Sequence, residues 1–87
     1  MKIPYWVVTD VKANEDYTLL ITFADGKKRI YDARPLLEKA VFSPLKNPAF
    51  FMRAKAEYGT VVWTEDIDIA PEYLYENSLP IDEGAMV

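Results

Sequence analysis

The stretch from Tyr17 to Asp32 constrains the fold most strongly, because it has the pattern of an antiparallel β-hairpin. Residues 18–23 are rich in β-branched and aromatic side chains, which are typical of a half-buried strand. The Asp25-Gly26 pair predicts a two-residue type I′ turn, since both central residues of that turn take positive φ angles. An isolated hairpin is only marginally stable in water, so further strands or helices must pack against it.

The predicted turn also sets the register of the hairpin. The expected cross-strand pairs are Phe23–Lys28, Ile21–Ile30 and Leu19–Asp32. In this register Ile30 lies on the apolar face, and Arg29 lies on the opposite face. A slip of one residue would turn the apolar set of the first arm toward solvent, so we expect the register to be well specified.

Segments on both sides of the hairpin complete the predicted architecture. Residues 5–13 have strand composition with a bulge near Asp10, and with the hairpin they form a three-stranded meander. Pro35 predicts a short helix over residues 35–40, and Pro44 ends the helical geometry that precedes it. Asn47 followed by proline predicts a second helix start, and Pro71 predicts a last helix over residues 71–76.

The segment Arg53–Glu57 fits two different structures. Phe50, Ala54 and Tyr58 lie at helical spacing, yet the apolar residues from 52 to 58 also alternate with charged ones at strand spacing. We interpret residues 53–57 as a strand that turns at Tyr58 into a second arm over residues 60–63, a choice favoured by the resemblance given below. The following residues, 64–69, are interpreted as an acidic loop.

The expected fold class is therefore α+β, with an antiparallel sheet (a three-stranded meander plus a second hairpin) and two or three short helices. A chain of 87 residues suits one domain. We place this domain at residues 1–77 and interpret residues 78–87, which lack periodicity, as a loosely held tail.

Composition disfavours several classes of function. The chain has no cysteine and no histidine, which removes thiol nucleophiles, the usual metal ligands and the usual general base. The net charge of −4 argues against a nucleic-acid binder, because phosphate binding relies on clustered cations. Without a membrane-length apolar run or the apolar core of a signal peptide, we expect a cytoplasmic protein. We expect no enzyme activity and no cofactor.

Several short motifs follow one another along the chain: Phe23-x-Asp25-Gly26, Asp32-x-x-Pro35-Leu36, Phe42-x-x-Leu45, Phe50-Phe51, Gly59-Thr60-Val61-Val62-Trp63 and Asp68-Ile69-x-Pro71-Glu72-x-Leu74-Tyr75. In this order and spacing they resemble the small prokaryotic family catalogued as domain of unknown function 2442. The resemblance covers residues 2–77 and implies an α+β fold with an antiparallel sheet. Members of the family are stand-alone short proteins or are joined to a helix-turn-helix DNA-binding segment, which this sequence does not show. Some of their genes resemble toxin–antitoxin-like pairs, and the resemblance implies no established catalytic residues. The chain departs from the family's usual Pro-Asn-Gly at residues 64–66.

The acidic residues after the second hairpin are the only group with the chemistry of metal ligands. They are Glu65, Asp66, Asp68 and Glu72. Their oxygens could hold Ca²⁺ or Mg²⁺, but the group lacks the spacing of an EF-hand loop. We expect Asp68 and Glu72 instead to cap and charge-complement the helix that starts at Pro71, and predict no metal site.

Two surfaces remain as candidates for binding. The basic patch consists of Lys27, Lys28, Arg29 and Arg34, which could follow phosphates or serve only as a solvated hairpin tip. The aromatic candidates are Tyr5, Tyr31, Tyr73 and Tyr75, because tyrosine is enriched at binding hot spots. We expect Trp6 and Trp63 to lie in the core. The leading hypothesis is a non-enzymatic module that binds a protein partner or itself, and the alternative is a nucleic-acid-linked regulator that uses the basic patch.

Overall fold

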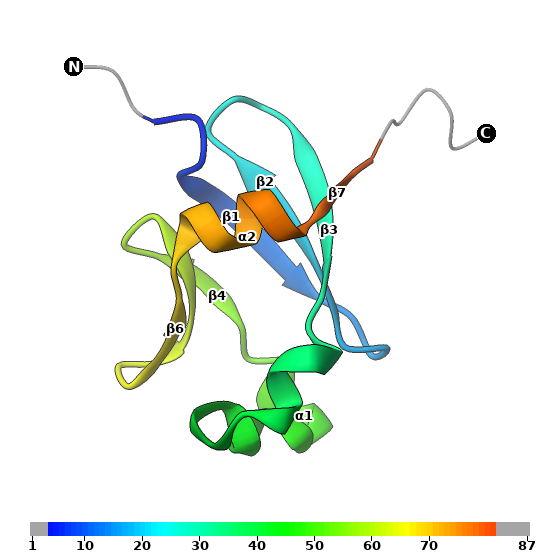
Figure 1. Ribbon diagram of the computed structural model, residues 1–87. Helices are drawn as coiled ribbons and strands as arrows, with labels where there is room; N and C mark the ends of the chain where they lie inside the picture. The colour runs from blue at the N-terminus through cyan, green and yellow to red at the C-terminus, as the bar shows by residue number, and fades with distance from the viewer. Residues whose placement is uncertain (1–3, 82–87) are drawn as a thin grey trace.

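Two antiparallel sheets and four short helical segments make up the fold in a computed structural model that describes residues 4–81 (Figure 1). The first sheet has the order β1-β2-β3-β7, with bounds Val8–Ala13, Thr18–Phe23, Lys28–Asp32 and Leu79–Pro80. The second has the order β4-β5-β6, with bounds Lys55–Glu57, Thr60–Thr64 and Ile67–Ile69. The 3₁₀-helices η1 and η2 span Arg34–Glu38 and Ala40–Lys46, and the α-helices α1 and α2 span Pro48–Phe51 and Pro71–Asn77. The α+β class, the meander and the second hairpin are thus confirmed.

The β2–β3 turn differs from the predicted one by one residue. The Gly26 amide donates to the Phe23 carbonyl over 2.9 Å, and the Phe23 amide donates to the Lys27 carbonyl over 3.0 Å. Gly26 has φ +84°, whereas Asp25 is not among the described residues with positive φ. These features define a three-residue loop, a type I turn followed by a glycine bulge, and the predicted type I′ turn is wrong.

The register of the hairpin shifts by one residue as a consequence. Leu19 faces Tyr31 and Ile21 faces Arg29, so the pairs predicted from the shorter turn are wrong. Tyr31 therefore replaces Ile30 on the inner face and is only 3% exposed. Ile30 pairs with Leu79 of β7 and lies on the other side of the sheet.

The second sheet begins as predicted and then adds a strand. β4 confirms the strand interpretation at residues 55–57, whereas Arg53 and Ala54 lie in the turn that follows α1 and were wrongly placed in the strand. The turn after β4 has positive φ at both Tyr58 and Gly59, as a type I′ turn requires. The predicted acidic loop is wrong at residues 67–69, which form β6. Ile67 and Ile69 are buried while the intervening Asp68 is exposed, so β6 is an alternating strand only three residues long.

The segment between the two sheets is helical over a longer range than predicted. Its amides bond three residues back, as in the Phe42 amide to the Lys39 carbonyl at 3.0 Å, and η2 continues through Pro44. The predicted end of the helix before this proline is wrong. Pro44 has no amide proton to donate, but its carbonyl accepts from the Asn47 amide over 3.2 Å, so the 3₁₀ turn continues past it. Asn47 accepts from the Ala49 amide and caps α1, which confirms that helix start. Within residues 4–81, none of the helices has the length and apolar character needed to cross a bilayer.

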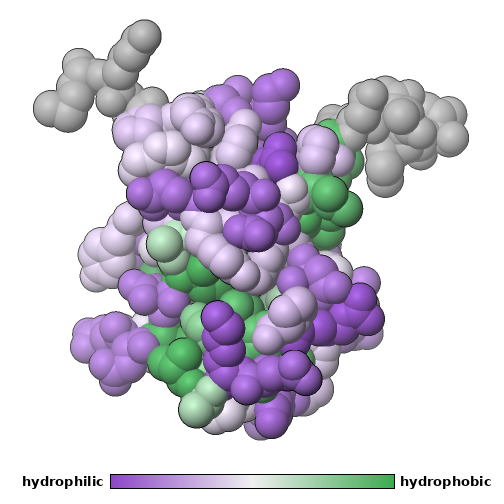
Figure 2. Space-filling model, in the orientation of Figure 1, coloured by the Kyte–Doolittle hydropathy of each residue, from purple (hydrophilic) through white to green (hydrophobic). Residues whose placement is uncertain are grey.

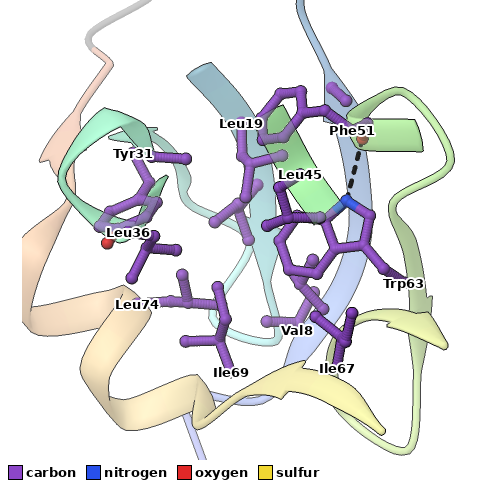
Figure 3. Packing of buried hydrophobic residues seen from close by; sticks show 14 of the residues in the cluster. Val8, Leu19, Tyr31, Leu36, Leu45, Phe51, Trp63, Ile67, Ile69 and Leu74 are labelled. Atoms are coloured by element: carbon purple, nitrogen blue, oxygen red, sulfur yellow. Dashed lines mark hydrogen bonds between the residues drawn. The ribbon is translucent and has the colours of Figure 1, made fainter. Parts of the chain in front are cut away.

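A single hydrophobic cluster joins both sheets to α2 and the helical segment (Figure 3). Val8 and Leu19 come from the first sheet, Ile69 from the second and Leu74 from α2. Trp63 is 3% exposed, as predicted, and its indole donates to the Phe51 carbonyl over 2.9 Å. Trp6 is only half-buried and lies outside the cluster, so its predicted core position is wrong.

The chain remains attached to the first sheet after α2. Leu79 and Pro80 pair with β3, and the Ile81 amide donates to the Lys28 carbonyl over 3.0 Å. The interpretation of a loose tail from residue 78 therefore fails for residues 78–81. The remainder of that tail, 82–87, and residues 1–3 of the predicted domain lie outside the described residues.

Tyr58 has a left-handed backbone conformation, which is unfavourable for a residue other than glycine. Its φ is 55° and its side chain is 93% exposed. A non-glycine residue in this conformation costs about 1–2 kcal/mol, and asparagine tolerates it best. We expect Tyr58→Asn to raise the free energy of unfolding by about 0.5–1 kcal/mol, measured by urea denaturation. Tyr58→Phe keeps the strain and serves as control; equal stability of the two variants would contradict this account.

Candidate functional site

The four candidate tyrosines form two separate pairs around α2. Tyr31 and Tyr73 pack edge to face, with ring centroids 6.0 Å apart and hydroxyl oxygens 3.4 Å apart. Tyr5 and Tyr75 form the other pair, with centroids 4.9 Å apart. Because Tyr31 is buried, it supports Tyr73 from within and adds little to an exposed surface.

Tyr75 is held on several sides. Its ring packs edge-on against Phe23 at 4.8 Å, and its hydroxyl donates to Asp25 Oδ2 over 3.0 Å. The Arg29 guanidinium carbon lies 4.6 Å from the centre of the same ring. These contacts fix α2 onto the β2–β3 hairpin. Of the four tyrosines, Tyr5 and Tyr73 expose the most surface, at 57% and 40%.

The basic patch is divided in the folded chain. Arg29 donates to the Ser78 hydroxyl over 2.7 Å and to the Ser78 carbonyl over 2.6 Å, which holds β7 in place. Arg34 donates with Nε and Nη2 to the Asp32 carboxylate, a forked arrangement whose hydrogen bonds lower the pKa of Asp32. Lys27 and Lys28 are exposed on the hairpin. Two of the four cations therefore have structural roles.

The acidic residues do not cap α2 in the predicted way. The N-cap of α2 is Ala70, without a side-chain hydrogen bond, so the expected capping by Asp68 is wrong. Glu72 lies in the first turn of α2, where its negative charge interacts favourably with the positive end of the helix dipole, as expected. Across residues 4–81, no three side chains of the Asp, Glu, Cys or His type are close enough together to hold a metal ion.

Two tyrosine hydroxyls are held in the protonated form. Burial, followed by the hydrogen bond with Tyr73, raises the pKa of Tyr31 well above the ordinary 10.0. The hydrogen bond to Asp25 raises the pKa of Tyr75. Because the folded state favours the neutral phenols, their contribution to stability is complete below pH 10 and is lost as pH rises further.

We expect a corresponding alkaline titration of the folded protein. Tyr31 should ionise only as the chain unfolds, giving a step in phenolate absorbance that coincides with loss of the circular dichroism signal. Tyr31→Phe should weaken the dependence of stability on pH above 10. A titration of all six tyrosines before unfolding would contradict this expectation.

An apolar groove lies between β6, α2 and the η1–η2 segment. It encloses about 250 Å³ and is lined by Leu36, Lys39, Phe42, Asp68, Ile69, Ala70 and Tyr73. Figure 2 shows hydrophobic surface gathered in this area at the centre of the visible face, with polar side chains around it. We refer to these seven residues as the α2 groove.

The α2 groove contains one candidate from the sequence, Tyr73, and residues that sequence reasoning missed. Leu36 and Ile69 form buried parts of its lining, Phe42 is half-buried, and the neighbouring Val41 is 59% exposed. The signal that was missed is the consecutive apolar pair Val41 and Phe42, which lies in a segment too short to bury both side chains. Of the sequence candidates, Tyr5, Tyr75 and the four basic residues do not line this groove.

A second cavity of about 290 Å³ lies near α1 and the β1–β2 turn. Its lining consists of Asn14, Glu15, Tyr17, Pro48, Ala49, Phe51 and Met52. Tyr17 donates to the Lys46 carbonyl over 2.6 Å and packs on Phe51 at 4.9 Å, so both rings serve to join α1 to the sheet. The α2 groove, which combines exposed apolar groups with charges on both sides, is the stronger candidate for binding.

Comparison with known proteins places the chain in a family. The chain matches no curated protein and no solved structure. Its residues 8–80 match the sequence profile of a family described as "Protein of unknown function (DUF2442)", which spans all of the strands and helices described above. The protein therefore belongs to the DUF2442 family.

Proposed function

We propose that this chain is a small non-enzymatic module that binds a protein partner through the α2 groove. The groove itself is the observation that carries the proposal, because apolar side chains from η1, η2, β6 and α2 line it, and those of Phe42 and Tyr73 reach solvent. Tyr73 lies at its edge, 40% exposed and backed by the buried Tyr31, so its ring is held in place before a partner arrives. Such a pre-positioned aromatic side chain is typical of a binding hot spot.

The size and the chemistry of the groove favour a protein over a small molecule. Sites for drug-sized ligands enclose about 300–1,000 Å³ and bury most of the ligand, whereas this groove encloses about 250 Å³ and is open. Without cysteine or histidine, the chain also lacks the usual nucleophile and base pairs. Some genes of the family resemble toxin–antitoxin-like pairs, which supports a partner encoded beside this chain. The proposal includes the predicted cytoplasmic location.

The alternative, a nucleic-acid-linked regulator, has less support. It requires four free cations on and beside the hairpin, but Arg29 is bonded to Ser78 and Arg34 to Asp32. The net charge of −4 opposes a polyanion further.

Co-purification from native cells tests the proposal with a matched pair of variants. Ala70→Gln places a longer neutral side chain in the α2 groove, and Ala49→Gln does the same in the second cavity, both at exposed positions. We expect a partner that wild type and Ala49→Gln retain after nuclease treatment and that Ala70→Gln loses, although all three unfold at the same urea concentration. A partner lost only with Ala49→Gln, or any partner lost upon nuclease treatment, would contradict the proposal.

A further inference from the structure

The strand β6 forms one wall of the α2 groove and is the last strand of its sheet. In the order β4-β5-β6, it pairs with β5 on one side and, within residues 4–81, with no strand on the other. An edge strand offers backbone groups to which an extended segment can add as a new strand. Asp68 and Ile69 of this strand both line the groove. A segment that enters the groove therefore lies next to an available sheet edge.

The opposite wall is suited to an apolar side chain. It consists of the buried Leu36 of η1 and the half-buried Phe42 of η2, with Lys39 between them in the sequence. In a strand, alternate side chains point to opposite faces, so every second residue of an added segment can reach such a wall. The groove thus fits an extended segment with at least one apolar anchor.

The charges along β6 define the chemistry of the partner. Asp68 is exposed and lines the groove, Glu65 and Asp66 precede it in the turn, and Glu72 follows in α2. Within the described part of the chain, none of these four carboxylates takes part in an ion pair. Lys39 is the single cation of the lining. A partner with lysine or arginine opposite Asp68 would complement this side of the groove.

The same charges disfavour a second copy of this chain. Antiparallel pairing of two β6 strands about their central residue would set one Asp68 directly opposite the other, and like charges at such positions are destabilising. Each copy also carries a net charge of −4. We infer that the α2 groove binds an extended basic segment of a different protein, which adds a strand to β6, sets lysine or arginine beside Asp68 and inserts an apolar side chain between Leu36 and Phe42. This inference rests on the proposed function.

Selection of peptides from a random display library on the intact protein tests the inference. We expect the selected peptides to be rich in lysine or arginine alternating with apolar residues, and to shift the amide resonances of Ile67–Ile69 in nuclear magnetic resonance spectra. Asp68→Lys should lower the affinity for the tightest-binding peptide about tenfold or more, because a like charge then faces the cation of the peptide. Glu76→Lys changes the net charge equally at an exposed position outside the groove and should weaken it far less.

The outcomes separate the inference from the function on which it rests. Peptides that bind wild type but not Ala70→Gln, yet lack cationic residues or ignore Asp68→Lys, would overturn the inference and leave the proposed function standing. Peptides that bind Ala70→Gln as well as wild type would count against both. An empty selection, or a dimer in light scattering that Ala70→Gln dissociates, would overturn the inference, while the co-purification result would still decide the proposed function.

Discussion

Replacing Phe51 with alanine is expected to lower the free energy of unfolding by about 3–5 kcal/mol, which is typical of a fully buried aromatic side chain. Phe51 is 1% exposed and packs between Tyr17, at 4.9 Å, and Trp63, at 5.9 Å. Its loss leaves a cavity where α1 meets both sheets. Small domains have about 5–15 kcal/mol of stability in total, so this one change removes a large share of it.

Urea denaturation followed by tryptophan fluorescence measures this effect, since one of the two indoles, that of Trp63, lies against the site of the change. Met52→Ala is the matched control, because the neighbouring side chain is 45% exposed and its removal should cost less than about 1 kcal/mol. If the Phe51 variant unfolded at nearly the same urea concentration as this control, α1 would not be an anchor of the core.

The β2–β3 hairpin shows how far local sequence determines the fold. The Asp25-Gly26 pair correctly located the turn, but a glycine with positive φ fits both the type I′ turn and the longer turn with a bulge. The choice between them depends on which residue of β3 fills the core. Tyr31 does so, packing against Tyr73 of α2, which lies 42 residues further along the chain. A short-range pattern cannot contain that contact, which is why the register was missed by one residue.

The candidate site was harder to predict for a related reason. The α2 groove is assembled from η1, η2, β6 and α2, and two of these four elements were not predicted. β6 is only three residues long, with one charged residue between two isoleucines, so its alternation was too brief to distinguish from a loop. Tyr73 was proposed from its residue type alone. Its exposure depends on Tyr31, which the predicted register had placed on the other face of the sheet.

Arg29 shows a different kind of error. Its charge placed it in a basic surface patch, but its contacts in the folded chain withdraw it from that patch. In the observed register Arg29 faces Ile21 on the inner side of the sheet, and its guanidinium reaches Ser78 beyond the end of α2. Ser78 is 4% exposed, so the guanidinium supplies hydrogen bonds that water cannot replace. Arg29, which the sequence placed either in a phosphate-binding patch or on a solvated hairpin tip, instead holds the C-terminal part of the fold.

Replacing Arg29 with methionine should therefore lower the free energy of unfolding by about 1.5–3 kcal/mol, the range for hydrogen bonds made by charged groups. Methionine keeps the apolar stem but removes both donors to Ser78 and the cation over the Tyr75 ring. The effect should be largest locally, since β7 has only two residues paired with β3. Hydrogen exchange at the Ile81 amide, which donates to Lys28, reports on that local opening.

Lys27→Met provides the matched control, because it removes the same charge from an exposed position on the same hairpin. It should change the stability by no more than about 0.5 kcal/mol and leave exchange at Ile81 slow. Equal stability and equal exchange in the two variants would mean that Arg29 does not hold β7, and would return it to the basic patch. Faster exchange in Arg29→Met alone would show that a residue of β3, counted by its charge in the basic patch, holds the segment that follows α2.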